Sequence, residues 1–106
     1  MMLKIFLDDC RTTPRGYVRT YTVEETIALI VENNGSILIL SLDNDLGEGL
    51  KEGKEVMKWI EEKAFLNEIK PIPILLIHSQ NNVAVSEMII ARDNAFKYWE
   101  GHGYDI

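Results

Sequence analysis

The sequence predicts an α/β fold, with a mostly parallel sheet and helices on its faces. Three short, almost purely apolar runs, at Leu3–Leu7, Ile37–Leu42 and 72–77, have the length and composition of strands that are buried on both faces. Segments with the periodicity of amphipathic helices lie between and after these runs. Such alternation of strand and helix is typical of parallel sheets whose connections are helical.

A further strand is expected at residues 17–21, where polar and apolar side chains alternate as in a half-exposed edge strand. The link between Leu7 and Val18 is shorter than the dozen or so residues that a parallel crossover usually needs. Two arrangements fit this spacing: a crossover helix reduced to a turn, or an antiparallel strand. We favour the reduced crossover.

Three helices are expected. The first begins at Thr22, which has capping-box spacing with Glu25, and ends at the Asn-Asn-Gly sequence of residues 33–35. The second covers residues 54–66, and the third begins with an asparagine cap at position 81 or 82 and ends near Gly101. Each helix has one apolar face, formed by Val23, Ile27, Ile30 and Val31, by Val56, Met57, Ile60 and Ala64, and by Ala84, Met88, Ala91, Ala95 and Trp99.

Length and composition indicate an ordinary globular protein. The chain of 106 residues suffices for a single domain, residues 1–106, and 46% of it is hydrophobic and 26% charged. The apolar runs stop at about six residues, whereas a membrane helix needs ~20, and the first residues lack the features of a signal peptide. Cys10 is the only cysteine, so an intrachain disulfide is excluded and a cytoplasmic location is expected.

The net charge of −6 argues against binding to extended duplex nucleic acid, because such binding requires Lys and Arg to neutralise phosphates. A single phosphate is a different matter, since a bound divalent cation and a local arginine would make an acidic site attractive to it. The charge therefore argues against a long nucleic-acid track but not against a small phosphoester such as a nucleotide, and no membrane binding is expected.

Acidic residues directly follow two of the core strands: Asp8 and Asp9 follow the first, and Asp43 and Asp45 follow the second. The carboxyl ends of parallel strands meet at one edge of the sheet, where open α/β folds bind their ligands. Carboxylates at such an edge repel one another, and a hard divalent cation such as Mg²⁺ or Mn²⁺ relieves that repulsion. The alternative is that each aspartate caps a helix or begins a loop. Two pairs at two strand ends favour the metal site.

Three further side chains are candidates for phosphate chemistry at this edge. His78 directly follows the third core strand and suits proton transfer near neutral pH; the alternative is a core or capping histidine. Ser79 can hydrogen-bond a phosphoryl oxygen. Arg11 has the fork of donors that binds a phosphate bidentately, although a solvated loop arginine is the equal alternative.

At these residues the sequence resembles a response-regulator receiver domain. Receivers have an acidic pair after strand one, a phosphoacceptor aspartate after strand three and a Ser or Thr after strand four. Asp8 and Asp9, Asp43, and Ser79 occupy those places in turn. The helix between the first two strands is missing, however, and the lysine that grips the phosphoryl group in receivers has no counterpart.

The additional residues are similar to a narrower group, the cyclic-phosphate processing receiver domains. The resemblance covers residues 3–88, with Asn44 at a position where histidine is common. The matching segments are Leu7-Asp8-Asp9-Cys10-Arg11 with Pro14, Val18-Arg19-Thr20, Leu42-Asp43-Asn44-Asp45-Leu46-Gly47, Gly53 followed by Trp59, and Ile77-His78-Ser79-Gln80-Asn81. The resemblance implies a truncated three-layer α/β/α receiver-like (flavodoxin-like) fold, with four strands in the order 2-1-3-4.

The same resemblance implies a metal-dependent phosphoesterase that acts on the 2′,3′-cyclic phosphate of a nucleotide or an RNA end. Asp8, Asp9 and Asp43 are expected to bind Mg²⁺ or Mn²⁺, with Asp45 as a further ligand. Asp43 or a metal-bound water is expected to attack phosphorus. Arg11 and Ser79 would orient the phosphate, and His78 would transfer a proton. The alternative is a divergent receiver without enzymatic activity, which binds metal or phosphate and changes its contacts with a protein partner.

Overall fold

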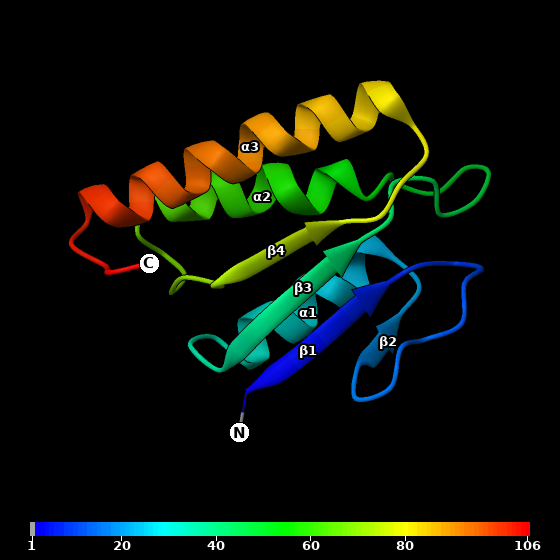
Figure 1. Ribbon diagram of the computed structural model, residues 1–106, viewed down its shortest axis with the longest axis horizontal. Coiled ribbons are helices and arrows are strands. Elements are labelled where there is room, and N and C mark those ends of the chain that lie inside the picture. Colours follow the sequence, from blue (N-terminus) through cyan, green and yellow to red (C-terminus); the bar gives the residue numbers. More distant parts are fainter. Residues whose placement is uncertain (1) are drawn as a thin grey trace.

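A computed structural model describes residues 2–106 and has the expected alternation of strands and helices (Figure 1). In chain order the elements are β1 (Leu3–Leu7), β2 (Val18–Thr20), α1 (Val23–Glu32), β3 (Ile37–Leu42), α2 (Lys54–Phe65), β4 (Ile74–Ile77) and α3 (Asn82–Gly101). None of the described helices is both long enough and apolar enough to span a membrane.

The four strands form one parallel sheet in the order β2-β1-β3-β4, which confirms the predicted order. The pairing of β1 with β2 is also parallel, so the reduced crossover is the correct alternative for this short link. All four strands therefore end at the same edge of the sheet, on the right in Figure 1. This edge carries the residues that the sequence analysis selected.

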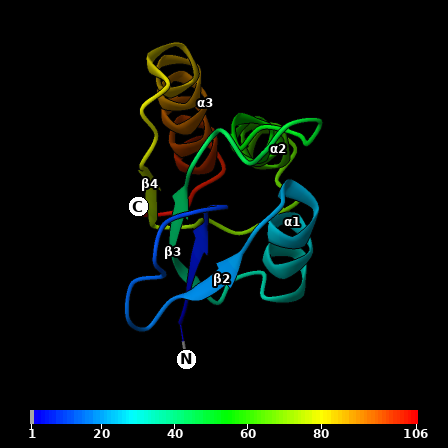
Figure 2. The same cartoon turned by 90° about the vertical axis from the view of Figure 1, so that its right-hand side faces the viewer.

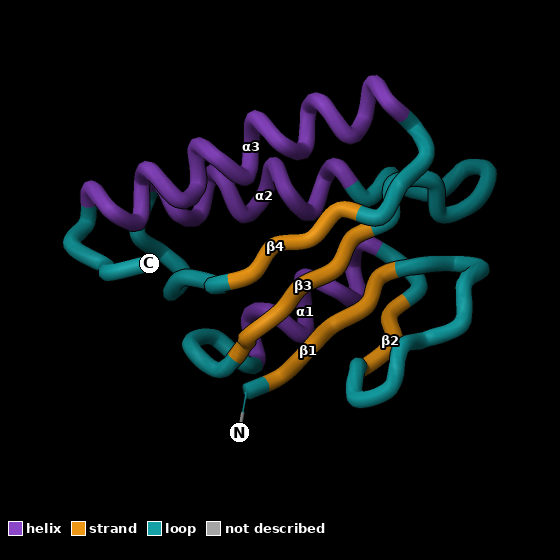
Figure 3. The backbone as a smooth tube through the Cα atoms, in the orientation of Figure 1, coloured by secondary structure: helices purple, strands orange, loops and turns teal. Residues whose placement is uncertain are grey.

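Every described helix lies on the same side of the sheet (Figures 2 and 3). The connections from β2 to β3 and from β3 to β4 cross the sheet in one direction, and right-handed crossovers then place α1 and α2 on one face. The receiver-like fold is thus confirmed, but among residues 2–106 the expected third layer is absent. On the open face Ile74 and Leu76 are 39% and 44% exposed, and the loop from Asp8 to Tyr17 lies beside β1 in place of a helix.

The element boundaries follow local chemistry. Thr22 caps α1, because its Oγ1 accepts from the Glu25 N–H at 3.2 Å; the Glu25 carboxylate accepts in return from the N–H of Tyr21 at 3.2 Å, one residue before the position that a capping box uses. At α3 the Asn81 side chain accepts from the Ala84 N–H at 3.1 Å. The strand expected from residue 72 begins only at Ile74, since prolines at 71 and 73 cannot donate to a sheet ladder.

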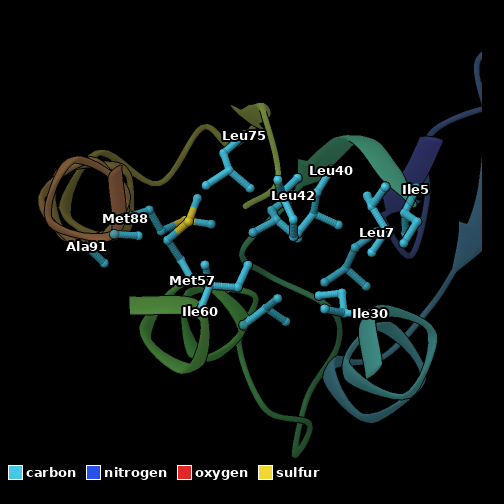
Figure 4. Packing of buried hydrophobic residues seen from close by; sticks show 14 of the residues in the cluster. Ile5, Leu7, Ile30, Leu40, Leu42, Met57, Ile60, Leu75, Met88 and Ala91 are labelled. Atoms are coloured by element: carbon cyan, nitrogen blue, oxygen red, sulfur yellow. The ribbon is translucent and has the colours of Figure 1, made fainter. Parts of the chain in front are cut away.

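The core lies between the sheet and the helices and fixes the strands relative to one another (Figure 4). Alternate residues of β1, β3 and β4 point into it, among them Leu7 in β1, Leu42 in β3 and Leu75 in β4. Met57 of α2 and Met88 of α3 meet them from the helix side. Because these side chains are almost completely buried, the three strand ends beside them are held in a defined register.

Candidate functional site

The end of β1 is organised around the fully buried side chain of Asp8. Its Oδ1 atom accepts hydrogen bonds from the backbone N–H groups of Cys10 and Arg11, both at 2.8 Å. Its Oδ2 atom accepts from Arg11 Nη1 and from His78 Nε2, both at 3.0 Å. Each oxygen of this carboxylate thus has two donors, which uses its ordinary accepting capacity.

These contacts set the charge of Asp8. Burial alone would raise its pKa, but the backbone N–H groups of Arg11 and Cys10, together with the Arg11 and His78 side chains, outweigh burial and hold the pKa below the usual 3.8. Asp8 therefore remains ionised at neutral pH and acts as a fixed negative charge at the centre of the site.

Arg19 of β2 stabilises the loop that follows Asp8 through hydrogen bonds. Its Nε atom donates to the Asp8 carbonyl at 2.7 Å, and its Nη1 atom donates to the Arg11 carbonyl at 2.7 Å and to Thr13 Oγ1 at 2.8 Å. The guanidinium also lies over the ring of Tyr21, 4.6 Å from its centre. Arg19 thus positions the backbone around Asp8 and Arg11.

The end of β3 presents a carboxylate of different character. Asp43 Oδ1 accepts from the Asn44 N–H at 2.8 Å, whereas the positive group that faces its Oδ2 atom among residues 2–106 is Arg11, whose Nη1 lies 3.8 Å away. Burial raises the pKa of Asp43 above 3.8, and the charge of Asp8 adds to this; the Asn44 N–H and the charges of Arg11 and His78 oppose it only in part. Asp43 is consequently the more basic carboxylate of the two, with one oxygen directed at the site and weakly bonded.

A buried amide and a close backbone contact hold Asp43 in place. The Asn44 side chain is fully buried; its oxygen accepts from the Lys54 N–H at 3.0 Å, and its nitrogen donates to Asp45 at 3.1 Å and Glu52 at 2.8 Å. The Gly53 N–H donates to the Asn44 carbonyl at 2.7 Å. A Cβ atom on Gly53 would lie 1.7 Å from the Asp43 carbonyl oxygen, so the helix can approach this closely only with glycine.

His78 joins the two strand ends. Its ring stacks on Phe6 with centroids 4.5 Å apart, and its Nδ1 atom lies 2.7 Å from Ser41 Oγ, while Nε2 faces Asp8. An ionised carboxylate only accepts hydrogen bonds, so Nε2 carries a hydrogen; in the neutral ring Nδ1 then accepts from the Ser41 hydroxyl. The side chain is 21% exposed, which leaves it within reach of a ligand.

The predicted site residues are gathered to different degrees. Carboxylate oxygens of Asp8, Asp9 and Asp43 lie within 4.8 Å of one another, and Arg11 and His78 bond to Asp8 directly. Asp45 is exposed, bonded to Asn44 and outside that group of three. Ser79 follows His78, and its hydroxyl oxygen accepts from the Asn81 N–H at 3.1 Å.

Three residues for which no sequence motif predicted a role also support the site: Ser41, Phe6 and Asn44. Ser41 is the one polar residue of β3, and its position opposite β4 is the signal that could have linked it to His78. Phe6 lies beside Ser41 on the open face, but an aromatic residue in an apolar strand carries no signal of a stacking role. The role of Asn44 depends on the fold of the following loop.

The three clustered carboxylates fit a divalent cation. Mg²⁺ and Mn²⁺ prefer oxygen ligands, and Mg²⁺ commonly uses one or two carboxylates and otherwise retains water. The guanidinium of Arg11, within 4 Å of both Asp8 and Asp43, already occupies this place as a positive group. The carboxylate oxygens and the position of the Arg11 guanidinium both indicate that this edge of the sheet binds positive charge.

A comparison with protein families gives a match over most of the chain. The family described as the cyclic-phosphate processing receiver domain matches residues 3–94, which is most of the chain. No curated protein and no solved structure matches the chain significantly. The match spans all the strands and the whole carboxylate cluster. The chain therefore belongs to the family of cyclic-phosphate processing receiver domains.

Proposed function

We propose that this protein is a divalent-metal-dependent phosphoesterase that opens the 2′,3′-cyclic phosphate of a nucleotide or an RNA end. The observation that carries the proposal is the convergence of three carboxylates, a guanidinium and an imidazole at one sheet edge, in a chain whose family is described by cyclic-phosphate processing. We place this activity in the cytoplasm, where a free exposed thiol such as that of Cys10 stays reduced.

Asp8, Asp9 and Asp43 would hold Mg²⁺ or Mn²⁺, with Asp45 as an outer ligand. When bound, the cation neutralises negative charge that develops on the phosphoryl oxygens. Asp8 supplies a permanent charge because its pKa is lowered, and Asp43 supplies an oxygen, Oδ2, that Arg11 Nη1 approaches only to 3.8 Å. Asp9 is exposed at the rim of the cluster.

Arg11 and Ser79 would orient the phosphate. Arg11 offers the planar fork that pairs with two phosphate oxygens, and its side chain is 44% exposed. The Ser79 hydroxyl oxygen accepts from the Asn81 N–H, so its hydrogen is available to a phosphoryl oxygen. Both groups follow strand ends at the same edge of the sheet, Arg11 after β1 and Ser79 after β4.

The reaction we propose consumes one water molecule. On the direct route a bond forms between the water oxygen and phosphorus while the bond from phosphorus to the ribose O2′ or O3′ breaks. On the other route an Asp43 oxygen makes that attack first, and water then cleaves the bond between Asp43 and phosphorus and restores the carboxylate. The proton lost by water ends on that ribose oxygen. Asp43 Oδ2 is suited to attack phosphorus, because the Arg11 Nη1 atom that faces it is 3.8 Å away. His78 in its doubly protonated form is suited to deliver the Nε2 proton to the departing oxygen and to regain a proton from water.

A hydrolysis assay tests the proposal. With Mn²⁺ and 2′,3′-cyclic AMP, we expect release of an adenosine monophosphate, and a loss of about 100-fold or more in Asp43→Asn and His78→Gln. Asp93→Asn is the matched control, because Asp93 is an exposed carboxylate of α3 that bonds only to Arg92 among the described residues. Equal background turnover by the unchanged protein and Asp43→Asn would refute the proposal for this substrate.

A second candidate is an interaction module that binds metal or phosphate without hydrolysis. The exposed side chains of Ile74 and Leu76 on the helix-free sheet face favour it, because apolar groups there are available to a protein partner. Beryllofluoride with Mg²⁺ distinguishes this candidate: a receiver-type site gives a saturable spectral change that Asp43→Asn abolishes, and no response contradicts it.

A further inference from the structure

A side chain of the protein occupies the place of a cation in the carboxylate cluster. Arg11 Nη1 lies 3.0 Å from Asp8 Oδ2 and 3.8 Å from Asp43 Oδ2 and donates to the His78 carbonyl at 2.7 Å. A carboxylate oxygen has about two lone pairs, and Asp8 Oδ2 already accepts from Arg11 and His78. A metal ion can bind this oxygen only if one of the two donors leaves.

Arg11 is the donor that can leave at smaller cost. Its side chain is 44% exposed and lies on the loop after β1, so water can replace its lost partners. His78 is 21% exposed, stacks on Phe6 and is bonded through Nδ1 to Ser41. Oδ1 of Asp8 keeps its two backbone donors in either case, so the carboxylate itself stays in place.

We propose that Arg11 is an internal counter-ion that a divalent cation displaces from Asp8 and Asp43, and that the displaced guanidinium then binds the phosphate of the ligand. The phosphate role rests on the proposed function, whereas the displacement rests on the contacts of Arg11 alone. The exchange keeps the acidic cluster neutralised in both states and frees the guanidinium fork only when the cation is present. Metal and phosphate binding are then positively coupled, and each raises the affinity for the other.

Nitrogen-15 NMR of arginine side chains tests the displacement directly. In metal-free protein we expect resolved, slowly exchanging Nη signals for Arg11, and saturating Mg²⁺ should average them with solvent. Arg19 is the internal control, because its Nη1 bonds to the Arg11 carbonyl and Thr13 do not involve the carboxylate oxygens and should persist. Arg11 signals that remain unchanged at saturation overturn the proposal, as does a failure of the protein to bind Mg²⁺.

Calorimetry of Mn²⁺ binding provides the second measurement. Arg11→Gln should bind Mn²⁺ about fivefold tighter or more, since no cation competes for Asp8 Oδ2. Arg15→Gln removes the same charge from an exposed arginine that forms no ion pair among residues 2–106, and should change the affinity much less. Equal or weaker Mn²⁺ binding by Arg11→Gln contradicts the displacement. Release of Arg11 without hydrolysis of any cyclic phosphate would refute the proposed function and leave this inference standing.

Discussion

The two acidic strand ends of the sheet hold their carboxylates by different means. At the end of β1, Asp8 is surrounded by charged or strongly polar donors, and both of its oxygens are fully bonded. At the end of β3, Asp43 is held by its backbone: Asn44 and Gly53 fasten the following loop, and one side-chain oxygen stays weakly bonded. Opposite pKa shifts follow from this contrast.

The contrast assigns separate tasks to two residues of the same type. A carboxylate saturated with donors is a stable charge and a poor base, whereas one with a raised pKa and an open oxygen can accept a proton, a cation or a phosphorus atom. The β1 end therefore depends on electrostatics and the β3 end on shape. Substitutions at the two strand ends should therefore lower the free energy of unfolding for different physical reasons.

The largest effect is expected from Gly53→Ala, which tests the role of shape at the β3 end. The added Cβ would lie 1.7 Å from the Asp43 carbonyl oxygen and 2.8 Å from its carbonyl carbon, so backbone must move. We expect a loss of about 3 kcal/mol or more in the free energy of unfolding. Urea denaturation measures it. Gly101→Ala is the control, since a Cβ there meets no atom within 4 Å; similar losses in both variants would contradict the contact.

Asp8→Asn should have the next largest effect, and Asp43→Asn a much smaller one. The first change removes the charge that Arg11 and His78 face, and such a loss at a buried site costs about 2–3 kcal/mol. The second removes a charge that burial already disfavours, so the free energy of unfolding should change by less than about 1 kcal/mol. Urea denaturation of both variants at neutral pH provides the comparison. Equal losses would show that the two ends are equivalent.

The pH dependence of these two variants should have opposite slopes. The pKa of Asp8 is lowered in the folded state, so its contribution to stability is present above 3.8 and is lost as pH falls through the folded value. The pKa of Asp43 is raised, so its contribution is present below 3.8 and is lost as pH rises through the folded value. Relative to the unchanged protein, Asp8→Asn should thus become less unfavourable in acid, and Asp43→Asn less unfavourable toward neutral pH. Unfolding titrations between acid and neutral pH check both slopes.

The sequence predicts features that depend on burial and strand direction, but not those that depend on loop conformation. Apolar runs and helical periodicity report burial, so the strands and the helices followed from Leu7, Leu42 and similar residues, whereas the strand order came from the resemblance to receivers. Parallel strand ends meet at one edge, so the approach of Asp8 to Asp43 also followed. The sheet face without helices could not be predicted, because the expected third layer came from the resemblance to receivers. The hydrogen bonds of Arg11 and Asn44 could not be predicted either, since they depend on loop conformations that leave no periodic pattern in the sequence.

Ser41→Ala should have a smaller effect than Asp8→Asn and tests the link between the two ends. The Ser41 hydroxyl bonds to His78 Nδ1 at 2.7 Å, and His78 Nε2 bonds to Asp8, so β3 supports a β1 carboxylate through the imidazole. Loss of one such bond should lower the free energy of unfolding by about 1 kcal/mol. A Ser41→Ala/Asp8→Asn double-mutant cycle should give a coupling free energy of about 0.5 kcal/mol or more, because each change weakens the same imidazole contact. Strict additivity would mean that the two strand ends are independent and that His78 only fills space on Phe6.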